Sequence, residues 1–318
     1  MFSRRRFLPL AAALGAACST GMQGGAARTP DAAAATAPAT GTSPAGPDFR
    51  FTGDFRGPLG VQLYSVRGAI RSDVPGTLAR VRALGFREVE LAGTYGMSAA
   101  DFRRVLDSAG LRATSMHVGY DRLRDSLSAV LADASALGVR NVGVAWIPHP
   151  AGPFTVAQAH QTADDFNRWG RAMRAAGVQL FYHTHGYEFQ PAADGTVPFD
   201  VLMRETDPAA VKFEMDVFWT ALPGQDPVAL LRRYQGRWAL MHLKDMRQGI
   251  VRNVQTGGAN PDSAEVPVGT GQIDYRAVLA AAHAAGVERF YIEDETADPF
   301  ATIPRSTAWL QTVRFRGA

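Results

Sequence analysis

The sequence predicts a single (β/α)8 barrel that follows a signal peptide and a flexible linker. From Pro58 onward, a helical stretch, a glycine and a short run of β-branched or aromatic residues recur in that order. Strict alternation of helix and strand predicts a parallel sheet. Eight such units in about 260 residues match the size of a closed barrel. A doubly wound open sheet is the alternative, but Tyr64-Ser65-Val66-Arg67 follows the first strand instead of a glycine-rich loop.

Glycines define where the individual elements begin and end. Gly85, Gly110, Gly138, Gly177 and Gly286 each follow a helical stretch, where a helix ends in the left-handed conformation that glycine adopts without steric cost. Together with three strands that lack this signature, they predict strands at 59–65, 87–91, 112–118, 140–146, 179–185, 211–217, 238–244 and 288–294. The predicted helices are 73–84, 98–109, 121–137, 155–176, 199–206, 226–235, 274–285 and 299–312.

The N-terminus predicts export. Residues 3–8, with the sequence SRRRFL, precede an apolar stretch that ends at Ala17. This stretch is too short to span a bilayer, which takes ~20 apolar residues, and it is typical of a signal peptide. The string resembles the twin-arginine export motif at every position. We therefore expect a twin-arginine signal peptide at 1–18, a linker rich in Ala, Gly, Pro and Thr at 19–50, a barrel catalytic domain at 51–318 and a periplasmic location.

The only cysteine, Cys18, lies at the end of the apolar stretch and is a candidate lipidation site. The alternative is an ordinary cleaved signal with which Cys18 is discarded. In either case the exported part contains no thiol and no disulfide.

The charge distribution argues against a nucleic-acid partner. The chain has 33 basic and 30 acidic residues, a formal net charge of +3. Residues 1–50 contain five of the basic residues and two of the acidic ones, so 28 of each remain in the body. A neutral body has no overall field to attract a polyanion. We expect membrane contact only through a lipid anchor, and the sequence indicates no oligomeric state.

Acidic and imidazole side chains gather at the predicted C-terminal ends of the strands, where such barrels place their active sites. Alternation along each strand turns Asp216, His242 and Glu293 toward the lumen from three neighbouring strands. Two carboxylates and an imidazole suit one divalent cation, such as Mn²⁺, Mg²⁺, Co²⁺ or Zn²⁺. The fifth strand is expected to supply a fourth ligand. One of His183 and His185 would bind the metal and the other the substrate, or Glu188 would fold back as the ligand.

Lysine occurs only at Lys212 and Lys244 in a chain that otherwise uses arginine. Both lie on predicted barrel strands. A compact, titratable ammonium makes Lys244, two residues past His242, a candidate acid/base or electrophile. Lys212 shares a strand face with Glu214, and we expect these two to form an ion pair in the lumen.

Three further residues are expected to line the substrate pocket: His117, Trp146 and Trp219. Aromatic faces suit the C–H side of a sugar ring, although simple packing is an equal alternative for the tryptophans. The long segment 246–271 is expected to form a lid or a substrate loop.

The body resembles the sugar phosphate isomerase/epimerase family of xylose isomerase-like TIM barrels. The matching phrases are GVQLYS at 60–65, YHTH and EF within 182–189, EMD and W within 214–219, HLKD at 242–245, GTG and ID within 269–274, and IE at 292–293. The resemblance implies one divalent metal, Mn²⁺ in the first place, held by Glu, Asp, His and Glu on successive strands. Asp216, His242 and Glu293 match the last three ligands, whereas His183 stands where the family has its first Glu.

The resemblance also implies chemistry on a carbonyl sugar. Without a phosphate cradle in the sequence, we expect a keto-sugar or 3-keto-glycoside as substrate. Removal of a proton α to the carbonyl gives an enediolate, with His185, Glu293 or Lys244 as base or acid. That intermediate leads equally to epimerase, isomerase or lyase products. The alternatives are an inactive exported sugar-binding barrel and a metal-dependent abasic-site endonuclease, which needs more ligands and a basic surface.

Overall fold

The computed structural model describes residues 49–150, 152–253 and 264–315. The expected signal peptide, Cys18 and nearly all of the expected linker lie outside the described residues. Phe49, which we placed in the linker, packs edge-on against Phe86 with 5.0 Å between ring centroids. Among the described residues, no helix is long and apolar enough to cross a membrane.

The predicted (β/α)8 barrel is confirmed. In the described residues, eight parallel strands close into a barrel in the order β1-β10-β7-β6-β5-β4-β3-β2. The strands are β1 (Leu59–Gln62), β2 (Glu88–Leu91), β3 (Arg112–Val118), β4 (Asn141–Val144), β5 (Gln179–His183), β6 (Val211–Asp216), β7 (Trp238–Leu243) and β10 (Arg289–Ile292). Each lies within or coincides with a predicted strand.

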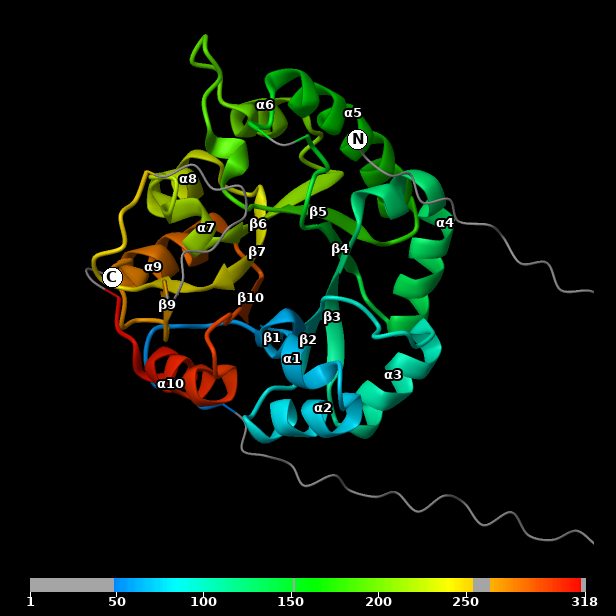
Figure 1. Cartoon of the computed structure of the whole chain (residues 1–318), viewed down its shortest axis with the longest axis vertical. Coiled ribbons are helices and arrows are strands. Elements are labelled where there is room, and N and C mark those ends of the chain that lie inside the picture. Colours follow the sequence, from blue (N-terminus) through cyan, green and yellow to red (C-terminus); the bar gives the residue numbers. More distant parts are fainter. Residues whose placement is uncertain (1–48, 151, 254–263, 316–318) are drawn as a thin grey trace, which may run out of the picture. The chain divides into compact units, whose positions relative to one another are not determined.

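Helices surround the barrel strands in Figure 1. All eight predicted helices are present: α2 (Val74–Ala83), α3 (Ala99–Ser108), α4 (Tyr120–Leu137), α5 (Val156–Ala175), α6 (Pro198–Glu205), α8 (Pro227–Arg233), α9 (Tyr275–Ala285) and α10 (Pro299–Thr312). The structure adds α1 (Arg67–Ile70), α7 (Val217–Ala221) and the 3₁₀ turns η1 (Leu63–Val66) and η2 (Tyr187–Phe189). These additions follow strands β1, β5 and β6 and form part of the rim above them.

The helix ends follow the expected chemistry. Gly138 and Gly286 end α4 and α9 at φ values of 72° and 83°, which disfavour any residue with a Cβ. At the start of α5, the Thr155 side chain accepts from Gln158 N and the Gln158 side chain accepts from Thr155 N, a complete capping box. Local sequence therefore fixes where these helices begin and end.

Strand β8 (Asp245–Met246) leads into the segment 246–271 and pairs antiparallel with β9 (Glu265–Val266) inside it. The Asp245 carboxylate accepts hydrogen bonds from the backbone N–H groups of Gly269 and Gly271, each at 2.9 Å. A Cβ at Gly271 would lie 2.3 Å from Asp245 Oδ1, so this close turn requires glycine. Residues 254–263 lie outside the described residues, and the role of the segment as a lid stays a prediction.

The expected Lys212–Glu214 ion pair is wrong. Lys212 lies at the start of β6, and its Nζ donates to the carbonyl of Gly236 at 2.6 Å. Glu214 lies two residues further along β6 and instead accepts from histidines at the other end of the barrel. Sharing a strand face did not bring the two together, because the long lysine side chain turns toward the N-terminal end of the barrel.

Candidate metal centre and active site

Polar side chains from neighbouring strands meet at the carboxyl end of the barrel. His183 ends β5, Asp216 ends β6, and Glu293 directly follows β10. Asp216 pairs in register with His242 of β7, and β7 in turn pairs with β10. All four side chains are buried. Strand register thus brings residues more than 100 positions apart in the chain to one place, since His183 and Glu293 are members of the same cluster.

One ligand atom from each of His183, Asp216, His242 and Glu293 lies within 4.8 Å of the others, and we call these four residues the metal-ligand group. The Asp216 Oδ2 atom is buried and accepts no hydrogen bond from the described residues. A buried carboxylate oxygen without a donor is the expected condition of a ligand atom. Two carboxylates and two imidazoles form the mixed oxygen and nitrogen set that suits a divalent transition metal. The residues present therefore fit a metal ion.

The charges in and around the metal-ligand group also favour a bound cation. Burial raises the pKa of Asp216 to about 8, against the partly compensating charge of Lys244. Burial would also raise the pKa of Glu293, but Lys244 and His242 hold it well below its usual range. Burial would lower the pKa of His242, whereas the charges of Glu214, Glu293 and Glu90 raise it well above the usual value. A divalent cation here would offset the excess of buried negative charge.

Two glutamates that we did not select lie directly beside this group. The Glu90 Oε2 atom lies 2.5 Å from His242 Nε2 and accepts from Gln62 Nε2 at 2.8 Å. The Glu214 Oε2 atom lies 2.9 Å from His117 Nε2 and 2.9 Å from His183 Nδ1. A second group of potential ligands, whose atoms also lie within 4.8 Å of one another, consists of His117, His183, Glu214 and His242.

The alternation of side chains along each strand could have predicted that both glutamates face the lumen. Glu90 sits on the second strand two residues after Glu88, so the two share a face, and Glu214 shares the face of Asp216. From the sequence, we expected Glu214 only as a partner for Lys212, and no expectation concerned Glu90. The pairing of Glu90 with His242 became visible only with the closed barrel.

Lys244 is enclosed by carboxylates. Its Nζ lies 3.4 Å from Glu265 Oε1 and 3.4 Å from Glu293 Oε2, and it also pairs with Glu295. The ammonium lies 5.3 Å from the centre of the Trp219 ring. Burial alone would lower the pKa of Lys244, but the carboxylates of Glu293 and Glu265 raise it well above its usual value. Lys244 is therefore a fixed positive charge beside Glu293 and holds its proton tightly.

His185 and Glu188 occupy different positions from the metal-ligand group. His185 lines the pocket, and burial lowers its pKa to about 3, so its imidazole is neutral. Glu188 is fully buried, belongs to neither group of potential ligands, and accepts the backbone N–H of His185 at 2.9 Å. Burial raises the pKa of Glu188 to about 8. In this structure His183, and not Glu188, supplies the fifth-strand side chain of the metal-ligand group.

A cavity of about 260 Å³ opens above the metal-ligand group. Its lining residues are Gln62, Tyr64, Ala92, His117, Ala145, His183, His185, Trp219, Glu293 and Glu295. His117 and Trp219, which we expected to line a substrate pocket, are among the lining residues of this cavity. Trp146 stands beside the cavity, 38% exposed, with its ring centroid 5.7 Å from that of His185. Tyr64, which is 41% exposed, is a lining residue that we did not select.

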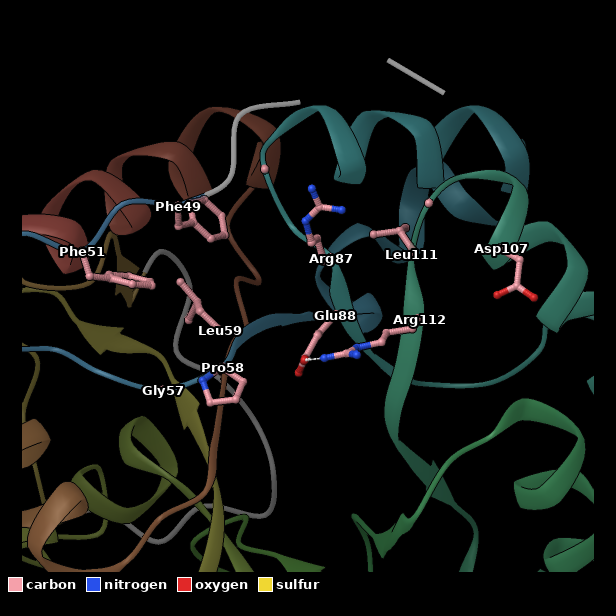
Figure 2. A pocket seen from close by; sticks show the side chains of 12 residues that line it. Phe49, Phe51, Gly57, Pro58, Leu59, Arg87, Glu88, Asp107, Leu111 and Arg112 are labelled. Carbon is pink, nitrogen blue, oxygen red and sulfur yellow. Dashed lines mark hydrogen bonds and ion pairs between the residues drawn. The ribbon is translucent and has the colours of Figure 1, made fainter. Parts of the chain in front are cut away.

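A larger cavity of about 570 Å³ lies at the opposite end of the strands (Figure 2). Phe49, Phe51 and Leu59 supply its apolar side, and the side chains of Glu88 and Arg112 meet in an ion pair at its wall (Figure 2). Glu88 also pairs with Arg289. Because Glu88 is neutralised by these two arginines, this cavity does not resemble the carboxyl-end site, where Asp216 keeps a carboxylate oxygen without a donor from the described residues.

The fold and the site define a (β/α)8 barrel with a potential metal centre at the carboxyl ends of its strands. The chain belongs to the xylose isomerase-like TIM barrel family, whose model matches residues 78–315. The family resemblance inferred from the sequence is confirmed.

Individual relatives extend this result. The chain is 29% identical to an inosose dehydratase of Lacticaseibacillus casei over 157 residues, which cover 48% of this chain and 51% of that protein. The chain thus spans about half the length of the curated relatives it matches. A sugar phosphate isomerase/epimerase from Parabacteroides distasonis superposes with a TM-score of 0.67 at 24% identity, over 82% of this chain and 96% of that one. The IolI protein, solved with a zinc atom, gives a TM-score of 0.61 at 13% identity over 80% and 95% of the two chains.

Proposed function

We propose that this protein is a divalent-metal-dependent enzyme that isomerises, epimerises or cleaves a keto-sugar or 3-keto-glycoside through an enediolate. The observation that carries the proposal is the buried convergence of His183, Asp216, His242 and Glu293 beneath a pocket. The likeness to an inosose dehydratase supports a substrate with a ketone beside hydroxylated carbons. Bound there, a divalent metal supplies Lewis acidity that favours ionisation of the carbon next to the carbonyl.

The surrounding residues supply a proton acceptor and a positive charge. The His185 imidazole lines the pocket, where it can contact the carbon α to the ketone and accept its proton. The Lys244 ammonium is paired with Glu293 and adds positive charge beside the pocket, which can stabilise negative charge that develops on the substrate oxygen. Return of the proton to the other face gives an epimer, its transfer to the neighbouring carbon gives an isomer, and departure of a β-substituent gives a lyase product.

The charges at the pocket favour an uncharged substrate over a sugar phosphate. The charged side chains that line the cavity include the carboxylates of Glu293 and Glu295, both of which pair with Lys244 behind it. The described lining residues include neither lysine nor arginine, and the Arg67 guanidinium lies 3.2 Å from Glu295 in an ion pair. A phosphate would therefore meet carboxylates at the wall of this small cavity, so we propose a neutral keto-sugar or glycoside of monosaccharide size.

Exchange in heavy water tests the proposal. The full chain with Mn²⁺ is incubated in D₂O with a panel of keto-sugars and 3-keto-glycosides, and the products are followed by NMR. Deuterium at a ring carbon without cleavage indicates an epimerase or isomerase, and loss of the aglycone or of water indicates a lyase. Asp216→Ala is the matched inactive control. Absence of exchange with every member, together with binding of a sugar, would support an inactive sugar-binding barrel instead.

Export through the twin-arginine route, with Cys18 as a lipid-bearing residue, is a separate proposal that rests on residues 3–18. Fractionation of the native host and the intact mass of the mature N-terminus test it. A lipid-modified Cys18 supports the anchor, an unmodified N-terminus beyond Cys18 supports ordinary cleavage, and a cytoplasmic full-length chain contradicts export.

A further inference from the structure

Each histidine of the metal-ligand group has one ring nitrogen committed to a buried glutamate. His242 Nε2 lies 2.5 Å from Glu90 Oε2, and His183 Nδ1 lies 2.9 Å from Glu214 Oε2. Both glutamates are fully buried and lie outside the metal-ligand group. A neutral imidazole has one N–H donor and one lone pair, so the nitrogen that donates to a carboxylate cannot also bind a metal.

The two histidine rings use different nitrogens for their hydrogen bonds to the glutamates. In His242 the Nε2 side faces Glu90, while Nδ1 faces the other ligands, at 3.2 Å from Glu293 Oε2 and 3.8 Å from Asp216 Oδ2. In His183 the committed atom is Nδ1, which leaves the lone pair on Nε2. Hydrogen-bonded carboxylates of this kind fix the tautomer and the orientation of a metal-binding histidine.

His117 contacts both of these glutamates. Its Nε2 lies 2.9 Å from Glu214 Oε2 and 3.3 Å from Glu90 Oε2. Its ring stacks on that of His242 at 5.7 Å between centroids with an interplanar angle of 16°. Glu90, Glu214 and His117 therefore form one hydrogen-bonded set beside the metal-ligand group.

We propose that Glu90 and Glu214 are positioning residues: Glu90 makes His242 a ligand through Nδ1, and Glu214 makes His183 a ligand through Nε2. This inference rests on the metal dependence in the proposed function. It also assigns the second group of potential ligands, His117, His183, Glu214 and His242, to hydrogen bonding and not to a second ion. Ions in both groups would require His183 and His242 to bind metal through both nitrogens at once, with neither ring keeping a proton.

Nitrogen NMR of the intact protein tests the tautomers directly. The full chain is labelled with ¹⁵N-histidine and loaded with Zn²⁺, which is diamagnetic, and long-range ¹H–¹⁵N spectra identify the protonated and the metal-bound nitrogen of each ring. We expect one ring bound through Nδ1 and one bound through Nε2. Glu90→Gln should shift the Nε2–H proton of the first, and Glu214→Gln the Nδ1–H proton of the second. Two rings bound through the same nitrogen overturn the inference, as does binding of two Zn²⁺ ions per chain.

Metal affinity provides a second, independent measurement. Glu90→Gln and Glu214→Gln keep the size of the side chain and remove its charge, and each should weaken Zn²⁺ binding by about 10–100-fold in a chelator competition. Glu88→Gln is the matched control, because Glu88 lies on the same face of β2 but pairs with Arg112 and Arg289 at the far end of the barrel. Its affinity should match that of the unmodified protein.

The outcomes separate this inference from the proposed function. If the unmodified protein binds no metal, both fail. If it binds one ion and both glutamine variants bind equally well, only the positioning role fails. If a variant does not fold, the tautomers in the unmodified protein still decide the question.

Discussion

The Lys244 Nζ atom lies 3.4 Å from Glu293 Oε2 and connects the end of β7 to the end of β10. Glu265 of β9 approaches the same ammonium at 3.4 Å, and Glu295 completes the set. One buried cation thus holds three carboxylates from two segments that are distant in the chain. This arrangement keeps Glu293 ionised while it faces the pocket.

Replacement of Lys244 by methionine should therefore destabilise the protein strongly. Removing one partner of a buried ion pair leaves an uncompensated charge and costs about 3–5 kcal/mol. The free energy of unfolding from urea titration, measured with and without chelator, checks this value. The double variant Lys244→Met with Glu265→Gln should recover part of the loss, because one of the stranded carboxylates is then neutral. A single variant as stable as the unmodified protein would contradict the ion-pair account.

Metal affinity should rise with pH up to about pH 8. Burial raises the pKa of Asp216 to about 8, so below that pH the metal-free protein holds a proton there that binding must displace. The raised pKa of His242 adds a second proton to be released. The apparent association constant should increase at least about tenfold per pH unit below pH 8 and rise less steeply above it. Chelator competition between pH 6 and 9 measures this slope, and a constant affinity across that range would show that binding displaces no proton from Asp216 or His242.

The features predicted from sequence were those that local patterns encode. Gly138 and Gly286 end helices whatever surrounds them, because a left-handed residue needs no tertiary partner. Asp216 and His242 could be placed together because neighbouring strands of a barrel share their carboxyl end. Repeated local signals and strand parity were therefore enough for the fold and for most of the candidate metal-ligand group.

Contacts across the closed barrel were the ones that sequence could not supply. Glu90 and His242 lie on strands that are not neighbours, and their hydrogen bond exists only because the barrel closes and turns both side chains inward. The partner of Lys212 depends on the direction in which its long side chain extends. Its ammonium donates to the Gly236 carbonyl, although Glu214 lies on the same face of the strand. Parity predicts a shared face but not which end of the barrel a long side chain turns to.

Replacement of His185 by glutamine should abolish turnover but leave the metal in place. His185 lines the pocket and belongs to neither group of potential ligands, so its ring can contact the substrate without holding the metal. Loss of a general base typically lowers the rate by about 10²–10⁴-fold. Deuterium exchange into a responsive keto-sugar measures the rate, and elemental analysis measures the metal. Asp216→Asn is the contrasting variant, in which metal content should fall together with the rate. Full activity in His185→Gln would contradict this role and would assign the general base to Glu293 instead.

Replacement of Glu188 by glutamine should change how stability depends on pH. Burial raises the pKa of Glu188 from 4.5 in the unfolded chain to about 8 in the folded one. The folded state therefore holds this proton more tightly, and the stability it contributes is complete below pH 4.5 and is lost as the pH rises to about 8. In that window the loss reaches about 1.4 kcal/mol per pH unit. Glutamine keeps the buried hydrogen-bond acceptor for His185 N–H and cannot ionise.

In chelator, the Glu188→Gln variant should gain stability relative to the unmodified protein as the pH is raised from 5 to 9, measured by urea unfolding at each pH. Asp194→Asn is the matched control from the same β5–α6 connection. Hydrogen bonds from Thr196 hold the pKa of Asp194 below its usual value, so this exposed group is ionised in both states over that range and should leave the slope unchanged. Parallel pH profiles for the Glu188 variant and the unmodified protein would show that Glu188 is already ionised in the folded barrel.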